Sequence, residues 1–261
     1  MATPPVLFTV AFRRKMAGLS PRQRQEWLAS LASKPGGIDL SDTPRVQELR
    51  EVARGCRLSL VESLAQRLGP FDGIHLGAIL EVPRERFVRK EDVEHSAADT
   101  PLALDSSGLA TISAPHAYLL SFRLLGLSAG DALVELGSGS GYGAALAAFI
   151  VGPGGSVVTF EIDPDLVARA RQSLLGEPNV KVIEGDAVAN SEQWRGASRV
   201  VVTFALDSWP SSWLDALPDG GRMVAPLGHD DQRLVLAERR GGRILETDHG
   251  AVRYVRNRSA R

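Results

Sequence analysis

Short apolar runs alternate with helical patterns through the second half of the chain, from residue 131 onward. Six runs have the length and flanking residues of strands, and they cover residues 132–136, 157–162, 180–183, 200–204, 223–227 and 234–237. Three segments between them predict helices, at 143–151, 164–175 and 209–217. Alternating strands and helices predict an α/β fold with a mainly parallel sheet that is covered by helices on both faces.

Helical patterns dominate the first part of the chain. Ser20-Pro21 and Thr43-Pro44 each place a capping residue before a proline that suits the first helical position. The predicted helices there cover residues 20–35, 42–53, 58–68 and 74–80. Glycine and proline then end the third helix at 69–70, and Pro83 follows the fourth.

A glycine-rich loop follows the first predicted strand and leads into a helix, with the sequence Glu135-Leu136-Gly137-Ser138-Gly139-Ser140-Gly141. Glycine lets the backbone turn sharply and approach a ligand closely, and the amides at the start of the helix favour a polar or negative group. The loop does not by itself identify the ligand, because a dinucleotide-binding fingerprint can also be placed from Gly139 through Gly141 to Ala144.

Acidic residues at the ends of successive strands narrow the choice of cofactor. Glu161 ends the second predicted strand, where a carboxylate can accept hydrogen bonds from both hydroxyls of a ribose. Asp186 follows the third strand and can receive an adenine amino group. Together with Glu135, these residues suit S-adenosylmethionine better than NAD, because the amino acid portion of S-adenosylmethionine replaces the pyrophosphate. An NAD-dependent oxidoreductase is the weaker alternative.

The segment Thr111-Ile112-Ser113-Ala114-Pro115-His116 lies just upstream of the first strand. It resembles the Thr-Ile-Ser-x-Pro-His segment of the protein-L-isoaspartate O-methyltransferase family. Similar motifs are Val-Pro-Arg-Glu-Arg-Phe-Val at 82–88, Ala-Asp-Thr-Pro-Leu at 98–102 and Gly-Gly-Arg-Met-Val-Ala-Pro-Leu-Gly at 220–228. The resemblance extends from about residue 58 to residue 254.

The resemblance implies a class I, Rossmann-like methyltransferase fold with a seven-stranded sheet and S-adenosylmethionine as cofactor. It implies cofactor contacts in the glycine loop (Glu135, Gly137, Ser138, Gly139 and Gly141) and at Ala110, Thr111, Ile112, Ser113, Glu161, Asp186 and Ala187. Ser113 takes the place of the family's active-site serine. A carboxylate whose pKa is about 4 is already ionised at neutral pH, so the acceptor needs no general base, and a serine hydroxyl can orient it.

The sequence thus predicts a carboxyl O-methyltransferase that acts on an isoaspartyl or aspartyl carboxylate of a protein or peptide. The resemblance implies that the methyl ester then collapses to a succinimide. A second hypothesis keeps the methyl transfer but has one dedicated client, an aspartate or C-terminal carboxylate of a ribosomally made peptide. A third hypothesis is a cofactor-binding protein that has lost catalysis and acts through a partner.

Three departures from the family pattern motivate these alternatives. Leu109 stands where the family has glutamine, Tyr118 stands where relatives have histidine, and Arg256-Asn257 replaces the expected proline and threonine. The first two predict an altered pocket, and the third predicts a C-terminal lid over the cofactor that differs from that of the family. We expect His116 to pack beneath the loop.

Composition limits the partners and the location. The 30 basic and 31 acidic residues leave a net charge of −1, which argues against a nucleic-acid-coating protein. No apolar run is long enough for a membrane helix, the histidines lack metal-ligand spacing, and the single cysteine favours a reduced, cytoplasmic location.

We expect a helical extension at 1–57 and a methyltransferase domain at 58–261. The extension is too short for a large core of its own, so it should pack on that domain or gate its substrate groove.

Overall fold

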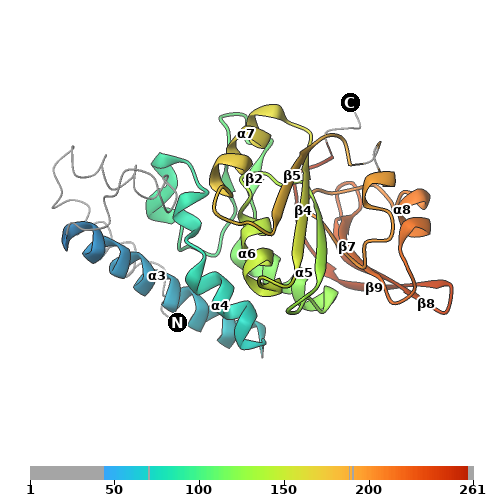
Figure 1. The fold of residues 1–261 in the computed structure, drawn as a ribbon, viewed down its shortest axis with the longest axis horizontal. Helices are drawn as coiled ribbons and strands as arrows, with labels where there is room; N and C mark the ends of the chain where they lie inside the picture. Colours follow the sequence, from blue (N-terminus) through green and yellow to red (C-terminus); the bar gives the residue numbers. More distant parts are fainter. Residues whose placement is uncertain (1–43, 70, 188, 190, 258–261) are drawn as a thin grey trace.

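The computed structural model describes residues 44–69, 71–187, 189 and 191–257, and the helix predicted at 20–35 lies outside them. A seven-stranded sheet forms the centre of the molecule, in the order β5-β4-β3-β6-β7-β8-β9 (Figure 1). Its strands are β3 (Ala132–Leu136), β4 (Ser156–Glu161), β5 (Val180–Glu184), β6 (Arg199–Val202), β7 (Arg222–Leu227), β8 (Arg233–Arg240) and β9 (Arg243–Ala251). The helices are α3 (Pro44–Leu68), α4 (Gly73–Glu81), α5 (Pro115–Leu125), α6 (Tyr142–Val151), α7 (Pro164–Ser173) and α8 (Ser211–Ala216).

The five strands from β5 to β7 run parallel, whereas β8 and β9 continue the sheet in antiparallel pairs. The predicted mainly parallel sheet is therefore confirmed. The pairing of β4 with β5 places Glu161 opposite Glu184, and the pairing of β3 with β4 places Glu135 opposite Thr159. This register brings the carboxyl ends of the strands, and the loops that follow them, to one edge of the sheet.

Buried side chains form two hydrophobic clusters, which lie on opposite faces of the sheet because neighbouring strand residues point to opposite sides. One cluster joins Leu133 and Val157 to α6 and to the α3 residues Cys56, Leu60 and Leu64. The other joins Val134, Leu136 and Phe160 to Trp194 and to Trp213 of α8. Helices thus cover both faces, as predicted.

Several elements differ from the sequence prediction, and the larger ones are these. The helices expected at 42–53 and 58–68 form a single helix, α3, so the predicted domain boundary after residue 57 falls within that helix. A lone glycine such as Gly55 weakens a helix but does not end it. The pattern also missed the helix α5. It missed the edge strand β9 as well, and most residues of β9 are exposed. Among the described residues, no helix is long and apolar enough to cross a membrane.

Candidate active site

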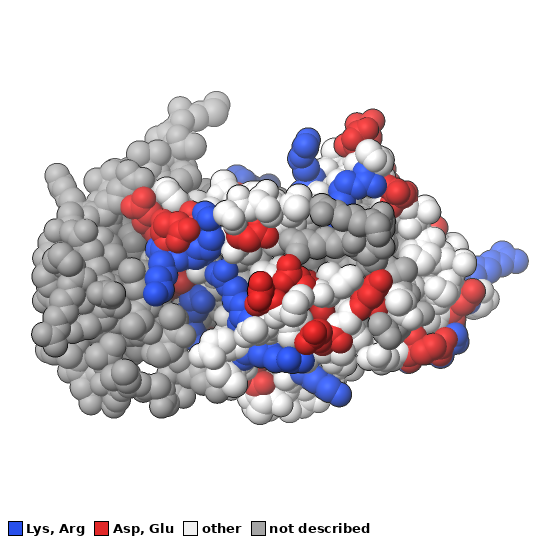
Figure 2. Space-filling view, turned by 90° about the horizontal axis from the view of Figure 1, so that it is seen from above, with Lys and Arg blue, Asp and Glu red and all other residues white. Residues whose placement is uncertain are grey.

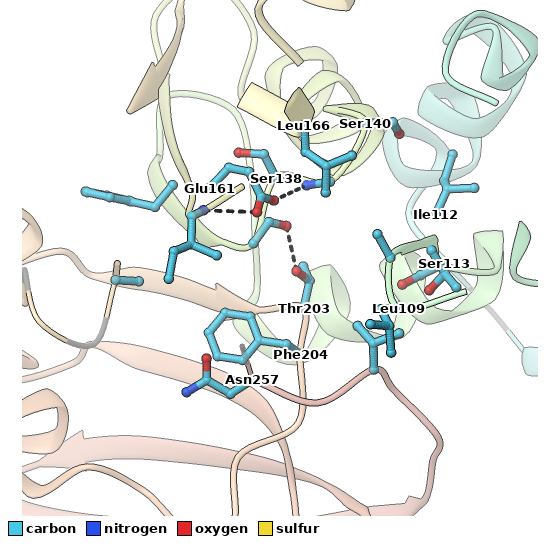
Figure 3. A pocket seen from close by; sticks show the side chains of 18 of the residues that line it. Leu109, Ile112, Ser113, Ser138, Ser140, Glu161, Leu166, Thr203, Phe204 and Asn257 are labelled. Carbon is cyan, nitrogen blue, oxygen red and sulfur yellow. Dashed lines mark hydrogen bonds between the residues drawn. The ribbon is translucent and has the colours of Figure 1, made fainter. Parts of the chain in front are cut away.

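A pocket with about 720 Å³ of empty space, part of it open to solvent, lies where the strand ends meet (Figure 3). Most of the predicted site residues line it, and they are Ala110, Thr111, Ile112, Ser113, Gly137, Ser138, Gly139, Glu161, Asp186 and Ala187. They come from β2 (Thr111–Ile112) with its flanking residues, from the glycine loop and from the ends of β4 and β5. Segments far apart in the sequence therefore meet in one concave site.

The glycine loop is fixed closely to the neighbouring strands. The amides of Gly137 and Ser138 both donate to the carbonyl of Phe160 at 2.9 Å. The hydroxyl of Thr203 donates to the carbonyl of Gly137 at 2.6 Å (Figure 3). Gly137 has a φ of 99°, and a Cβ there would lie 2.3 Å from the Thr203 hydroxyl oxygen. Any side chain at this position would therefore force the loop or the Thr203 side chain to move.

The Glu161 carboxylate is held by backbone amides at the edge of the pocket. It accepts hydrogen bonds from the amides of Gly139 at 2.8 Å and Ile162 at 3.0 Å (Figure 3). It also accepts one from the amide of Asp163 at 3.1 Å. These contacts fix a carboxylate at the end of β4, where it can receive hydroxyl groups of a ligand.

Glu135 and Gly141 are predicted site residues that do not line the pocket. Glu135 is 1% exposed, and its carboxyl group accepts a hydrogen bond from the Thr159 hydroxyl at 2.7 Å. Thr159 in turn lies 2.6 Å from the hydroxyl of Ser138, so Glu135 supports the loop from beneath. Burial raises the pKa of Glu135 to about 8. Gly141 has a φ of 88° and provides the N-cap of α6.

His116 does not pack beneath the loop, so that prediction is wrong. Its side chain is 41% exposed, and its Nδ1 lies 3.0 Å from both carboxylate oxygens of Asp99. The backbone amide of His116 also donates to Asp99, at 2.9 Å. Burial alone would raise the pKa of Asp99, but the hydrogen bonds from His116 and Arg67 outweigh it and hold that pKa at about 2. The ionised Asp99 therefore anchors the start of α5.

Several pocket residues were not predicted as site residues, and they are Leu109, Tyr118, Ser140, Phe160, Ile162, Leu166, Gly185, Thr203, Phe204, Val255, Arg256 and Asn257. Phe160, Ile162 and Gly185 adjoin predicted acids, so the strand ends could have indicated them. Leu109 and Tyr118 were noted only as departures from the family. Thr203 and Phe204 end the strand predicted at 200–204, so that strand end could have indicated them too, and they reach the pocket through the pairing of β6 with β3.

The C-terminal segment returns to the pocket despite its departure from the family pattern. The amide of Ala205 donates to the carbonyl of Val255 at 2.8 Å, and the amide of Asn257 donates to the carbonyl of Ala205 at 3.1 Å. Arg256 also contacts the Asp207 carboxylate at 2.8 Å. Arg256 and Asn257 thus line the pocket although they differ from the proline and threonine that the family resemblance implies there.

The comparisons with known proteins agree with this geometry. The profile of the family described as protein-L-isoaspartate(D-aspartate) O-methyltransferase matches residues 62–260. This chain belongs to the protein-L-isoaspartate O-methyltransferase family. A protein-L-isoaspartate O-methyltransferase of Methanococcus aeolicus is 38% identical over 180 residues, which is 68% of this chain and 82% of that protein. Protein-L-isoaspartate O-methyltransferase 2 of Archaeoglobus fulgidus is 38% identical over 202 residues, covering 76% and 91%.

Solved structures of the protein-L-isoaspartate O-methyltransferase family share the fold. One superposes with a TM-score of 0.70 at 26% identity, and the match covers 77% of this chain and 65% of that chain. Another, from Plasmodium falciparum in complex with S-adenosyl-L-homocysteine, gives a TM-score of 0.67 at 24% identity and covers 77% and 97%. The class I methyltransferase fold predicted from the sequence is therefore confirmed.

Proposed function

We propose that this chain transfers the methyl group of S-adenosylmethionine to the free carboxylate of an isoaspartyl residue in a protein or peptide. The pocket carries this conclusion, since it brings Ser113, the glycine loop and Glu161 together at one edge of the sheet in a member of this family. The names of the relatives favour isoaspartyl substrates over one dedicated peptide client.

The residues of the pocket fit a ligand made of a nucleoside and an amino acid. Glu161 is already oriented by three backbone amides, so it would hold the ribose hydroxyls. Asp186 would receive the adenine amino group, with the apolar side chains of Ile162 and Ala187 beside the ring. Thr111 and the glycine loop would hold the amino acid portion.

When bound, S-adenosylmethionine would supply an electrophilic methyl group on a sulfonium centre, which a carboxylate oxygen would take in one displacement as the methyl–sulfur bond breaks and S-adenosylhomocysteine leaves. The acceptor carboxylate is ionised at neutral pH, so no residue of the chain has to remove a proton. The Ser113 hydroxyl donates one hydrogen bond that orients the acceptor oxygen. In the ester product, the adjacent main-chain nitrogen attacks the ester carbonyl, and methanol leaves as the succinimide forms.

The experiment compares an isoaspartyl peptide with its aspartyl version and follows methyl ester by mass spectrometry. We expect methylation of the isoaspartyl peptide, and Ser113→Ala should lower kcat by about 10- to 100-fold because one orienting hydrogen bond is lost. Calorimetric titration of both proteins with S-adenosylhomocysteine provides the control for cofactor binding. Methylation of the aspartyl peptide alone, or no turnover by a protein that binds S-adenosylhomocysteine, would contradict the proposal.

The remaining expectations about partners concern the surface and the location. Figure 2, which views the molecule from above relative to Figure 1, shows acidic and basic side chains intermixed over that face. This mixture supports a peptide partner of no fixed charge more than a polyanion. That the chain binds neither nucleic acid nor membrane, and that it is cytoplasmic, stay predictions.

A further inference from the structure

The backbone of Ser113 is held at its carbonyl and at its amide by two buried side chains. The carbonyl of Ser113 accepts a hydrogen bond from Nη2 of Arg84 at 3.0 Å, and its amide donates to the hydroxyl of Tyr118 at 3.3 Å. Arg84 is 1% exposed and Tyr118 is 9% exposed. Neither residue has a part in the reaction described above, yet both contact the residue that orients the acceptor.

Arg84 connects Ser113 to a second segment beside the pocket. Its guanidinium donates to the carbonyls of Ser96 at 3.1 Å, Ala98 at 2.9 Å and Thr100 at 2.8 Å, in addition to that of Ser113. A buried charge is costly to desolvate and is weak evidence for a purely stabilising role. The planar group with its several donors instead fixes the geometry of carbonyls that belong to separate segments.

Tyr118 holds the amide of Ser113, and its ring has little freedom to move. The ring packs edge-on against Tyr142, with centroids 5.5 Å apart. A Cβ added at Gly143 would lie 2.7 Å from a ring carbon of Tyr118, so the helix α6 passes directly beside it. Burial raises the pKa of Tyr118, and the hydroxyl therefore stays protonated at any working pH.

From these contacts we infer that Tyr118 and Arg84 are positioning residues, which set the direction in which the Ser113 hydroxyl meets the acceptor carboxylate. The inference rests on the proposed function of Ser113. Since small displacements of an orienting group reduce the rate strongly, loss of the Tyr118 hydroxyl should lower kcat and leave cofactor affinity unchanged.

The experiment compares Tyr118→Phe with Tyr142→Phe as a matched control. Among the described residues, the buried hydroxyl of Tyr142 has no hydrogen-bond partner, so its removal deletes no contact to Ser113. We expect Tyr118→Phe to lower kcat by about 3- to 10-fold, the effect of one hydrogen bond, with an unchanged Kd for S-adenosylhomocysteine. Tyr142→Phe should keep the kcat of the parent protein.

Two further measurements separate positioning from general stability. If Tyr118 acts through Ser113, Tyr118→Phe should lower kcat much less in a Ser113→Ala background than in the parent protein. Amide hydrogen exchange should be faster in a fragment that contains Ser113 in Tyr118→Phe, but not in Tyr142→Phe. Equal falls in kcat in both backgrounds would overturn the inference.

Hydrogen exchange also distinguishes failure of this inference from failure of the proposed function, because it needs no turnover. Unchanged exchange in Tyr118→Phe overturns the positioning role whether or not an isoaspartyl peptide is methylated. If the parent protein proves inactive but Tyr118→Phe still exchanges faster than the parent, the contact to Ser113 is supported and only the proposed activity is rejected. Arg84→Lys, which keeps the charge but not the planar fork, should show faster exchange over both segments that Arg84 joins.

Discussion

At the scale of single residues, Glu135 couples the stability of the fold to pH. The carboxyl group lies beneath the glycine loop, where burial raises its pKa from an ordinary 4.5 to about 8. The nearby Glu161 charge adds to this effect, and the hydrogen bond from Thr159 opposes it. The folded protein therefore retains a proton on Glu135 over a range in which the unfolded chain has released it.

This difference predicts that the folded protein loses stability as the pH rises. Below pH 4.5 both states are protonated at Glu135, so the full stability is present there, and it falls until the pH passes about 8. Glu135→Gln does not titrate, so its melting temperature relative to that of the parent protein should rise between about pH 5.5 and about pH 8.5. Thermal melts at both pH values measure this, and a constant difference would refute the assignment.

At the scale of elements, the sequence predicted every strand of the seven-stranded sheet except the edge strand β9. The central strand β3 was predicted with its exact bounds, because its apolar run reflects burial by helices on both sides. The edge strand β9 carries polar residues at most of its exposed positions, so its pairing with β8 left no hydrophobic pattern to read. A helix such as α3, interrupted in its pattern by Gly55, was likewise divided in two.

Two helical glycines should respond in opposite ways to alanine. A Cβ at Gly55 of α3 would meet no atom within 4 Å, whereas a Cβ at Gly143 of α6 would lie 2.0 Å from an oxygen of Glu135. Gly55→Ala should raise the free energy of unfolding by about 0.5–1 kcal/mol, and Gly143→Ala should lower it by about 1–3 kcal/mol. Urea denaturation compares the two variants, and a shift of both in the same direction would contradict this packing.

At the scale of the whole molecule, the site depends on contacts that no local pattern encodes. The glycine loop, Ser113 and Glu161 could be predicted because each lies within a local motif or directly at the end of a predicted strand. The C-terminal residues 255–257 reach the same pocket through backbone pairing with Ala205, about 50 positions earlier. No local pattern encodes backbone pairing of that kind, so only the resemblance to the family, which implies a C-terminal lid, indicated that Asn257 lies near the pocket.

The helix α3 is joined to the rest of the molecule by a buried ion pair. Arg57 of α3 pairs with Glu85, and its Nε donates to the carbonyl of Leu80 at 2.7 Å. Because Glu85 is buried beside Arg84, removing its partner would leave an uncompensated charge. We expect Arg57→Met to lower the free energy of unfolding by about 3–5 kcal/mol. Arg54→Met, which breaks an exposed pair with Glu81 on the same helix, should cost less than about 1 kcal/mol.

Removing both charges tests whether the loss of stability in Arg57→Met comes from the unpaired carboxylate of Glu85. Arg57→Met combined with Glu85→Leu leaves no buried charge, so most of the stability should return. Since α3 shares one hydrophobic cluster with α6, urea denaturation should show a single transition in every variant. A separate early transition of α3, or limited proteolysis that releases a folded N-terminal fragment, would instead show that the extension is an independent unit and that α3 is not part of the methyltransferase core.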